Sequence, residues 1–453
     1  MLRVHYVPNR VERTIGELMN SRPARRTPAL LAWGAAAVAI VIAGTLVAVI
    51  VRGAPGGGVA STVATAPAPV QSTGVPAAAR VPAAAGTLPA PGSVPVTTGA
   101  PEYYVSTDTE GNLMATDTVT GQQIARVPSP DGYQFTGVTA AADDRTFVVV
   151  ASTATERRSW FRVTLDPGSA QPLRLTQLPV PSVFGDGAVT DGFALSGSGT
   201  ELAVALHLSA ITPANQRQQA AVEVYSVATG TLLRDWSTTM PSGQWAFGYS
   251  PVGPSSDALE TNALTWVEGD RAVVFPVKWH SADNLVHVTM RRLDLYASGS
   301  DLLGGSRVIW SQQGPADSAR YQGCDSSDDP LVSADGKTVS CWSVSEAPTP
   351  GSNQKKLVDW TLTWQVYFDT VPGAPRDVFR KTFTGEPVNS IPFLNVVWTD
   401  TAGGTVLGFW SFSTGNVNQV QQGFGTVSAS GRFQDLPRPA QNVGPGTVKG
   451  IAW

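Results

Sequence analysis

The stretch Phe193–Leu208, FALSGSGTELAVALHL, places two apolar segments on either side of a tight turn made of Gly, Ser and Thr. Apolar segments separated by a short polar turn in this way are typical of a β-hairpin. The same pattern recurs along the chain at 138–152, 263–279, 331–342 and 396–410. Its recurrence predicts an all-β fold built from a repeated hairpin, because no segment after residue 100 shows a convincing helical period.

Further strands accompany these hairpins. The stretches 113–127 and 222–236 each contain two apolar segments joined by a Thr-Gly turn, and similar units lie at 161–175, 292–303 and 364–379. Each repeat is therefore expected to contain four strands, here named a to d, over about 45 to 65 residues. Four-stranded repeats of this kind are typical of β-propeller blades, and their number predicts about six blades.

Three of the turns between strands a and b resemble, to different degrees, the S-x-D-G-K turn of TolB-like and WD-repeat propellers. Ser333-Ala334-Asp335-Gly336-Lys337 matches this turn well, whereas Ser196–Thr200 and Glu268-Gly269-Asp270 match it loosely. No repeat ends in the Trp-Asp dipeptide. The resemblance implies a propeller fold and no particular activity. The layout of the whole chain is also similar to uncharacterised membrane-anchored propellers of actinobacteria.

The two ends of the folded part are expected to build one blade together. Residues 448–453, VKGIAW, look like a strand a with nothing after it, whereas 102–106 and 112–127 look like strands b to d with no strand a before them. Combining the two ends closes the ring and pairs edges that would otherwise be open.

The first hundred residues contain three regions of different composition. Residues 1–27 form an Arg-rich head, 28–51 an uncharged and almost wholly apolar segment, and 52–100 a linker rich in Ala, Pro and Gly. As a helix, the apolar segment is long enough to cross the ~30 Å hydrocarbon core of a membrane. Because the Arg cluster precedes it, the head is predicted to be cytoplasmic and residues 101–453 extracytoplasmic. A signal peptide cleaved near Gly58-Val59-Ala60 is the alternative.

Composition separates the linker from the folded part. The linker is expected to be disordered because it carries little charge and no aromatic residue. Residues 101–453 contain 12 of the 13 Trp, and 23 Lys and Arg against 33 Asp and Glu, a net charge of −10. This acidity argues against binding to nucleic acid or to anionic lipid. Four His and two Cys are too few for a zinc array.

The lengths of the connections suggest a binding face. Turns a–b and c–d are short, whereas the b–c and d–a connections include the long stretches 180–191, 209–219, 238–258, 312–328 and 343–358. In an antiparallel blade, b–c and d–a connections lie on the same face, and long loops on a rigid scaffold often bind partners. The linker should enter at the opposite face, where strand b of the closing blade begins.

Six residues are candidates for ligand binding. Trp245, Phe247 and Tyr249 lie in the 238–258 connection, where they either cap a neighbouring loop or stack on a ligand such as a sugar or peptide. Asp186 and Asp191 lie in a Gly-rich connection, where turn chemistry alone also explains them. Asp325 belongs to an acidic group with Asp328 and Asp329 that lacks the spacing of a calcium loop.

The remaining polar residues suggest a disulfide and no metal or cofactor. Cys324 and Cys341 lie in the predicted extracytoplasmic part, where a disulfide between them is expected; two buried thiols are the alternative. His280 and His287 flank a turn that contains Asp283, but so few ligands do not predict a metal site. The sequence contains no G-x-S-x-G, H-E-x-x-H or Gly-rich dinucleotide motif, so no catalytic residue is assigned.

These features favour a single-pass, membrane-anchored extracytoplasmic propeller that binds a protein, peptide or glycan without catalysing a reaction. Two alternatives remain open. One is an extracellular hydrolase or lyase, in which Asp186, Asp191 and Asp325 would converge at the central funnel. The other is a transmembrane signalling or regulatory protein whose cytoplasmic head contacts a partner.

Overall fold

The computed structural model divides the chain into two compact units, Met1–Pro82 and Ala83–Trp453. The residues that the structure describes all belong to the second unit: 88, 101–108, 110–153, 158–180, 188–208, 219–247, 264–281, 285–315, 330–351, 357–368, 376–387, 393–399, 406–413, 420–428, 430–437 and 451–452. The predicted membrane segment 28–51 lies outside them, and within these ranges no helix is long and apolar enough to cross a membrane.

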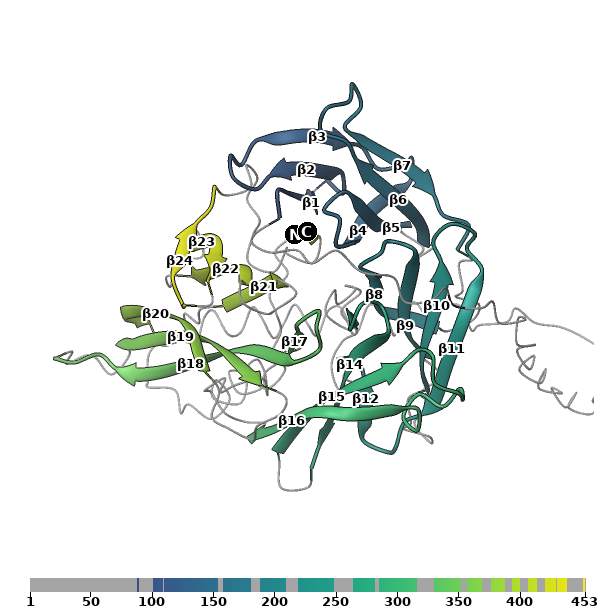
Figure 1. Ribbon diagram of the computed structural model, residues 1–453. Helices are drawn as coiled ribbons and strands as arrows, with labels where there is room; N and C mark the ends of the chain where they lie inside the picture. The colour runs from purple at the N-terminus through teal and green to yellow at the C-terminus, as the bar shows by residue number, and fades with distance from the viewer. Residues whose placement is uncertain are drawn as a thin grey trace, which may run out of the picture. The chain divides into compact units, whose positions relative to one another are not determined.

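The described strands form six antiparallel sheets, which are the blades of a β-propeller (Figure 1). In each sheet the strands are given from the first to the last in hydrogen-bonded order. Blade 1 contains β25 (Ile451–Ala452), β1 (Tyr103–Thr107), β2 (Leu113–Asp117) and β3 (Gln123–Val127). Blade 2 contains β4 (Tyr133–Ala140), β5 (Thr146–Thr153), β6 (Arg158–Leu165) and β7 (Leu173–Gln177). Blade 3 contains β8 (Ala188–Leu195), β9 (Glu201–Leu208), β10 (Gln219–Ser226) and β11 (Leu232–Thr239).

The second half of the ring is built in the same way. Blade 4 contains β12 (Gln244–Ala246), β13 (Thr265–Val267), β14 (Ala272–His280), β15 (Leu285–Asp294) and β16 (Ser306–Pro315). Blade 5 contains β17 (Leu331–Val332), β18 (Thr338–Pro348), β19 (Leu357–Phe368) and β20 (Arg376–Pro387). Blade 6 contains β21 (Phe393–Thr399), β22 (Val406–Ser413), β23 (Val420–Val427) and β24 (Phe433–Asp435).

The blades follow one another around a ring. Strand β4 contacts β25 and β8, and β13 contacts β8 and β17. Strand β21 contacts β19 of blade 5 and returns to β25 of blade 1. Strands β4, β8, β17 and β21, the first strands of their blades, lie innermost in Figure 1, and the predicted all-β propeller is confirmed.

Blade 1 is assembled from both ends of the folded part. Strand β25 pairs antiparallel with β1, so that Val105 lies opposite Ala452 and Ser106 opposite Ile451. Ala452 is buried in the same cluster as Val105 and Phe147 of blade 2. The predicted closure is confirmed: the C-terminal strand supplies strand a for strands b to d at the start of the fold.

Blade 4 differs from the other blades in its innermost strand, which is split in two. Strand β12 pairs with the Val277–Trp279 end of β14, whereas β13 pairs with the Ala272–Val274 end of the same strand. Gln244–Ala246 therefore belongs to the sheet, and the expected 238–258 connection is not a continuous loop. Phe247, directly after β12, and Leu264, directly before β13, are both buried.

Apolar side chains fill the spaces between neighbouring blades. In β9, Leu202 and Val204 join a cluster with blade 2, whereas Ala203 and Ala205 join a cluster with blade 4. The alternation of side chains along a strand makes this possible, because successive residues point to opposite faces of the sheet. Blade 3 is thus buried on both faces, which explains why β9 is apolar at nearly every position.

One residue of the linker is part of this core. Leu88 is 9% exposed and belongs to the cluster between blades 3 and 4. Leu88 therefore belongs to the core, although it lies in the segment 52–100 that was expected to be a disordered linker.

Candidate functional site

The propeller has two different faces, because antiparallel strands put alternate connections at opposite ends of a blade. We call the face with the a–b and c–d turns the short-turn face, and the face with the b–c and d–a connections the long-connection face. The strand bounds place the long connections 209–218, between β9 and β10, and 316–330, between β16 and β17, on the long-connection face. Residues 209–218 and 316–329 lie outside the described ranges.

The a–b turns on the short-turn face share one local structure. Ser196 Oγ accepts hydrogen bonds from the backbone N–H groups of Thr200 and Glu201, at 3.1 and 3.0 Å. Ser333 Oγ accepts the N–H of Thr338 at 3.0 Å in blade 5. In blade 2 the carboxylate of Asp143 accepts the N–H of Thr146. The first polar residue of each turn therefore closes it by accepting backbone N–H groups. These hydrogen bonds explain why the turns resemble the S-x-D-G-K turn.

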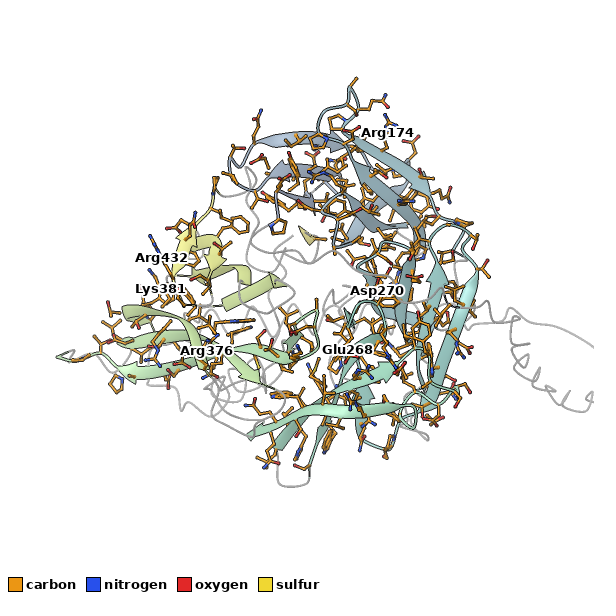
Figure 2. The ribbon with its side chains drawn as sticks, in the orientation of Figure 1. Arg174, Glu268, Asp270, Arg376, Lys381 and Arg432 are labelled. Carbon is orange, nitrogen blue, oxygen red and sulfur yellow. The ribbon has the colours of Figure 1, made fainter. Side chains whose placement is uncertain are left out.

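These turns also connect neighbouring blades. Asp270, in the β13–β14 turn, accepts hydrogen bonds from the backbone N–H groups of Gly197 and Ser198 in blade 3, at 2.7 and 2.8 Å. The backbone N–H of Ala142 in blade 2 donates to the carbonyl oxygen of Gly197 at 2.9 Å. Figure 2 places Asp270 toward the middle of the ring, at the inner end of blade 4.

A further pair of contacts extends this chain of turns in both directions. Glu268 N–H in blade 4 donates to the carbonyl oxygen of Ala334 in blade 5, at 2.8 Å. In blade 2, Asp144 accepts the backbone N–H groups of Glu102 and Tyr103 at 2.7 and 3.1 Å. Glu102 directly precedes β1, so blades 1 to 5 are linked turn to turn on the short-turn face.

Asp144 is an unusual carboxylate. Burial raises its pKa to about 6, because removing the carboxylate from water outweighs the N–H donors of Tyr103 and Glu102 and the nearby Arg145 cation. Arg145 Nη1 lies 3.3 Å from Asp144 Oδ2, and its guanidinium lies 4.5 Å from the centre of the Tyr103 ring. Asp144 also adopts a φ of +55°, a left-handed conformation that Asp and Asn tolerate better than most residues.

Asp191 forms a buried pair with His207. The Nδ1 atom of His207 lies 2.7 and 2.8 Å from the two carboxylate oxygens of Asp191. The β8–β9 register shifts between Thr190 and Gly192, and Asp191 is the extra residue of this bulge. The side chains of His207 and Asp191 are only 3% and 7% exposed.

The position of the pair explains what it can do chemically. Strand β8 begins at the long-connection face and β9 ends there, so the pair lies toward that face of blade 3. A carboxylate on Nδ1 orients the imidazole, as in acid–base dyads. Both side chains are buried, and the pair joins β8 to β9 within the blade.

His207 was not predicted, and Asp191 was expected in a loop. The available signal for His207 is an ionisable side chain near the end of the apolar run ELAVALHL, in which Glu201 is the other one. Sequence alternation could not pair it with Asp191, because the bulge in β8 shifts the register by one residue.

Two of the three candidate aromatic residues are buried. Trp245 is 5% and Phe247 1% exposed, and the ring of Phe247 packs 5.6 Å from that of Phe275. The backbone N–H of Phe247 also donates to the carbonyl oxygen of Pro276. Pairing of β12 with β14 therefore places these rings between blades and not on the surface where a ligand would stack. Tyr249 lies outside the described residues.

Most of the other candidates cannot be placed. Asp186, Asp283, Cys324, Asp325, Asp328 and Asp329 lie outside the described residues. Cys341 is buried in β18 and is not a free thiol, so its disulfide with Cys324 remains a prediction. His287 stacks on Trp279 with ring centres 4.8 Å apart and hydrogen-bonds with Ser281 Oγ. Within the described part of the chain, no three His, Cys, Asp or Glu side chains are grouped to hold a metal ion.

No protein-family model matches this chain, and no curated protein matches it. Among solved structures, the chain is similar to the Dos1 propeller at 10% identity, covering 74% of this chain and 77% of that one, with a TM-score of 0.37. It is similar to the β-propeller domain of the Trilobed protease from Pyrococcus furiosus at 10% identity, covering 67% and 72%, with a TM-score of 0.30. It is also similar to a periplasmic gluconolactonase from Pseudomonas aeruginosa at 15% identity, covering 74% and 98%, with a TM-score of 0.34.

These similarities are too low to transfer any activity to this chain. The propeller assignment rests on the sheet topology described above. The likeness to TolB-like and WD-repeat families stays a prediction from the turn sequences.

Proposed function

We propose that this chain is a single-pass, membrane-anchored propeller that presents its long-connection face to an extracytoplasmic protein, peptide or glycan. The observation that supports this proposal is the set of contacts between blades on the short-turn face of the propeller. On the short-turn face, the carboxylates of Asp144 and Asp270 and the backbone N–H of Glu268 are engaged in contacts between blades. That face holds the ring together, which leaves the opposite face for a partner.

The attachment of β1 adds a second argument. Because Asp144 binds the N–H groups of Glu102 and Tyr103, the start of β1 is held at the short-turn face. The chain that precedes it leads back to the linker and the predicted membrane segment 28–51. The proposed anchor therefore precedes, in the sequence, a strand whose start lies at the short-turn face. The anchor itself rests on the apolar run and the Arg-rich head.

The net charge of −10 on residues 101–453 narrows the class of partner. A negatively charged surface repels nucleic acid and other polyanions at long range. The proposed partner is accordingly a protein, a peptide or a glycan without many acidic groups.

Site-specific photo-crosslinking of the full-length protein on intact cells tests the face assignment. A photoreactive residue replaces Asp131 or Gln219, which are exposed on the long-connection face, or Thr120 or Lys337, which are exposed on the short-turn face. We expect a defined adduct from Asp131 and Gln219 and none from the matched pair Thr120 and Lys337. Adducts formed from Thr120 and Lys337 alone, or from none of the four positions, would contradict the proposal.

Membrane anchoring has its own test. Full-length protein should resist extraction from membranes at alkaline pH, and a variant lacking residues 28–51 should be soluble. Release of the full-length protein by the same extraction would show that residues 28–51 do not span the membrane.

A further inference from the structure

The core between blades 3 and 4 contains a residue from outside the propeller repeats. Leu88 lies fifteen positions before Tyr103, where the first strand begins, and is 9% exposed. It belongs to a cluster that includes Trp236 of β11, Trp266 of β13 and the buried Leu302. The compact unit accordingly begins at Ala83 and not at the first strand.

The sequence of the linker explains why Leu88 is suited to burial in this core. Between Gly53 and Ala100, Leu88 is the only Leu, and there is no Ile, Met or aromatic residue. Apart from Gln71 and Arg80, the linker otherwise contains Ala, Pro, Val, Gly, Ser and Thr. Leu88 thus has the most apolar surface to remove from water, and it is buried.

We infer that the surface between blades 3 and 4 is a docking site for the chain's own linker, with Leu88 as the anchor residue. Docking closes only the short segment between Leu88 and Glu102, and the entropy cost of loop closure grows slowly with length. A segment tethered this closely has a high effective concentration, so that a single apolar side chain suffices as an anchor.

Docking changes what the linker does mechanically. The propeller is held by two contacts, Leu88 between blades 3 and 4 and Glu102–Tyr103 at the blade 2 turn. The short segment between Leu88 and β1 is therefore held to the propeller at both of its ends. This inference does not depend on the proposed binding function.

Crosslinking from position 88 tests the docking directly. Full-length protein in detergent micelles carries a diazirine analogue of leucine at position 88, and the crosslinked peptides are identified by mass spectrometry. We expect crosslinks to peptides containing Trp236, Trp266 or Leu302. The control carries the same analogue at Ala79, which precedes the compact unit. Equal or scattered crosslinking from positions 88 and 79 would overturn the inference.

A stability measurement provides a second, independent test. Leu88→Asn should shift the folding equilibrium of the full-length protein toward the unfolded state by about 10- to 100-fold, the effect of losing one buried Leu side chain. The matched control Val81→Asn introduces the same polar group before the compact unit and should change the equilibrium less than about 2-fold. Equal effects of the two substitutions would overturn the docking. Both measurements use detergent micelles, so their outcome is separate from the tests of anchoring and of the binding face.

Discussion

The carboxylate of Asp270 accepts a hydrogen bond from the backbone N–H of Ser198, which lies in the neighbouring blade, at a distance of 2.8 Å. The second carboxylate oxygen accepts the N–H of Gly197 at 2.7 Å. Asp270 is buried and has a φ of +65°. One side chain thus satisfies two backbone donors of another blade at the inner end of the ring.

Asp270→Asn should destabilise the protein by about 2 kcal/mol, because an amide cannot accept both N–H groups, and hydrogen bonds to a charged group are the stronger ones. Asn tolerates the positive φ, so the substitution isolates the hydrogen bonds from backbone strain. Urea unfolding gives the free energy. The control Asp335→Asn affects a carboxylate bonded within its own turn, to Ser333 Oγ and Lys337 N–H, and should cost less than about 1 kcal/mol. Equal costs would show that the contact between blades adds nothing.

Asp144 should make the protein less stable as the pH rises through about 6. Burial raises its folded pKa above the unfolded value near 3.8, so its contribution is fully present below the unfolded pKa and is lost above the folded pKa. The loss amounts to about 2 to 3 kcal/mol from a shift of this size. The Asp144→Asn variant lacks the titrating carboxyl group. Its free energy of unfolding, relative to that of the wild type, should therefore increase by that amount between pH 4 and pH 8. Urea unfolding at each pH measures the difference.

Asp117 serves as a control for this experiment, because its pKa is shifted in the opposite direction to that of Asp144. The hydrogen bond from the backbone N–H of Thr120 lowers the pKa of Asp117, so its contribution is present at neutral pH and is lost in acid. Asp117→Asn should therefore lose stability relative to wild type as the pH rises from acid to neutral. A parallel response of the two Asn variants would refute the assigned direction for Asp144.

Removal of Gly450–Trp453 should lower the melting temperature by more than about 10 °C, because blade 1 loses its innermost strand and the buried Ala452. A synthetic peptide with the sequence of residues 448–453 should restore part of the loss by pairing with β1. Thermal unfolding followed by Trp fluorescence measures both. An unchanged melting temperature in the shortened chain would contradict closure of the ring through this strand.

His207→Leu should destabilise the protein by about 3 kcal/mol, because the buried Asp191 carboxylate loses its charged or hydrogen-bonding partner. In the double variant with Asp191→Leu, no carboxylate remains, and most of the stability should return. A double-mutant cycle of unfolding free energies measures the coupling. Additive losses from the two substitutions would show that the pair is not energetically coupled.

The predicted Cys324–Cys341 disulfide should appear as a crosslinked peptide under non-reducing conditions. Closing a loop of this length stabilises a protein by about 3 kcal/mol in the chain-entropy model. Cys341→Ser should therefore lower stability by a similar amount, and a reducing agent should have no additional effect on this variant. Detection of two alkylated thiols in the native protein would exclude the bond.

Much of the ring could be predicted from local patterns. Short apolar segments around Gly- and Asp-containing turns gave the hairpins, and the unpaired strand at 448–453 gave the closure that Val105 and Ala452 confirm. Turn residues were also informative, since Ser196 and Ser333 close their own turns. All these features depend on residues near one another in sequence or on a missing partner in a repeat.

Contacts between distant residues were harder to predict. Trp245 and Phe247 lie in a stretch with the composition of a loop, and only pairing with β14 explains why they are buried. The bulge at Asp191 pairs it with His207, although simple alternation in β8 does not indicate this contact. Leu88 lies in a stretch without any strand pattern, so its burial depends entirely on a surface formed by blades 3 and 4.

The split innermost strand of blade 4 makes that blade a natural point at which to divide the molecule. Strands β12 and β13 each keep their own register on β14, so a chain break between Phe247 and Leu264 interrupts no described ladder. Two separately expressed halves, one ending after Phe247 and the other beginning before Leu264, should reassemble. They are joined where β12 pairs with the complete β14–β15–β16 sheet and where β25 and β1 close blade 1. The two halves therefore form a split reporter. Recovery of the folded propeller shows that the two fragments have associated.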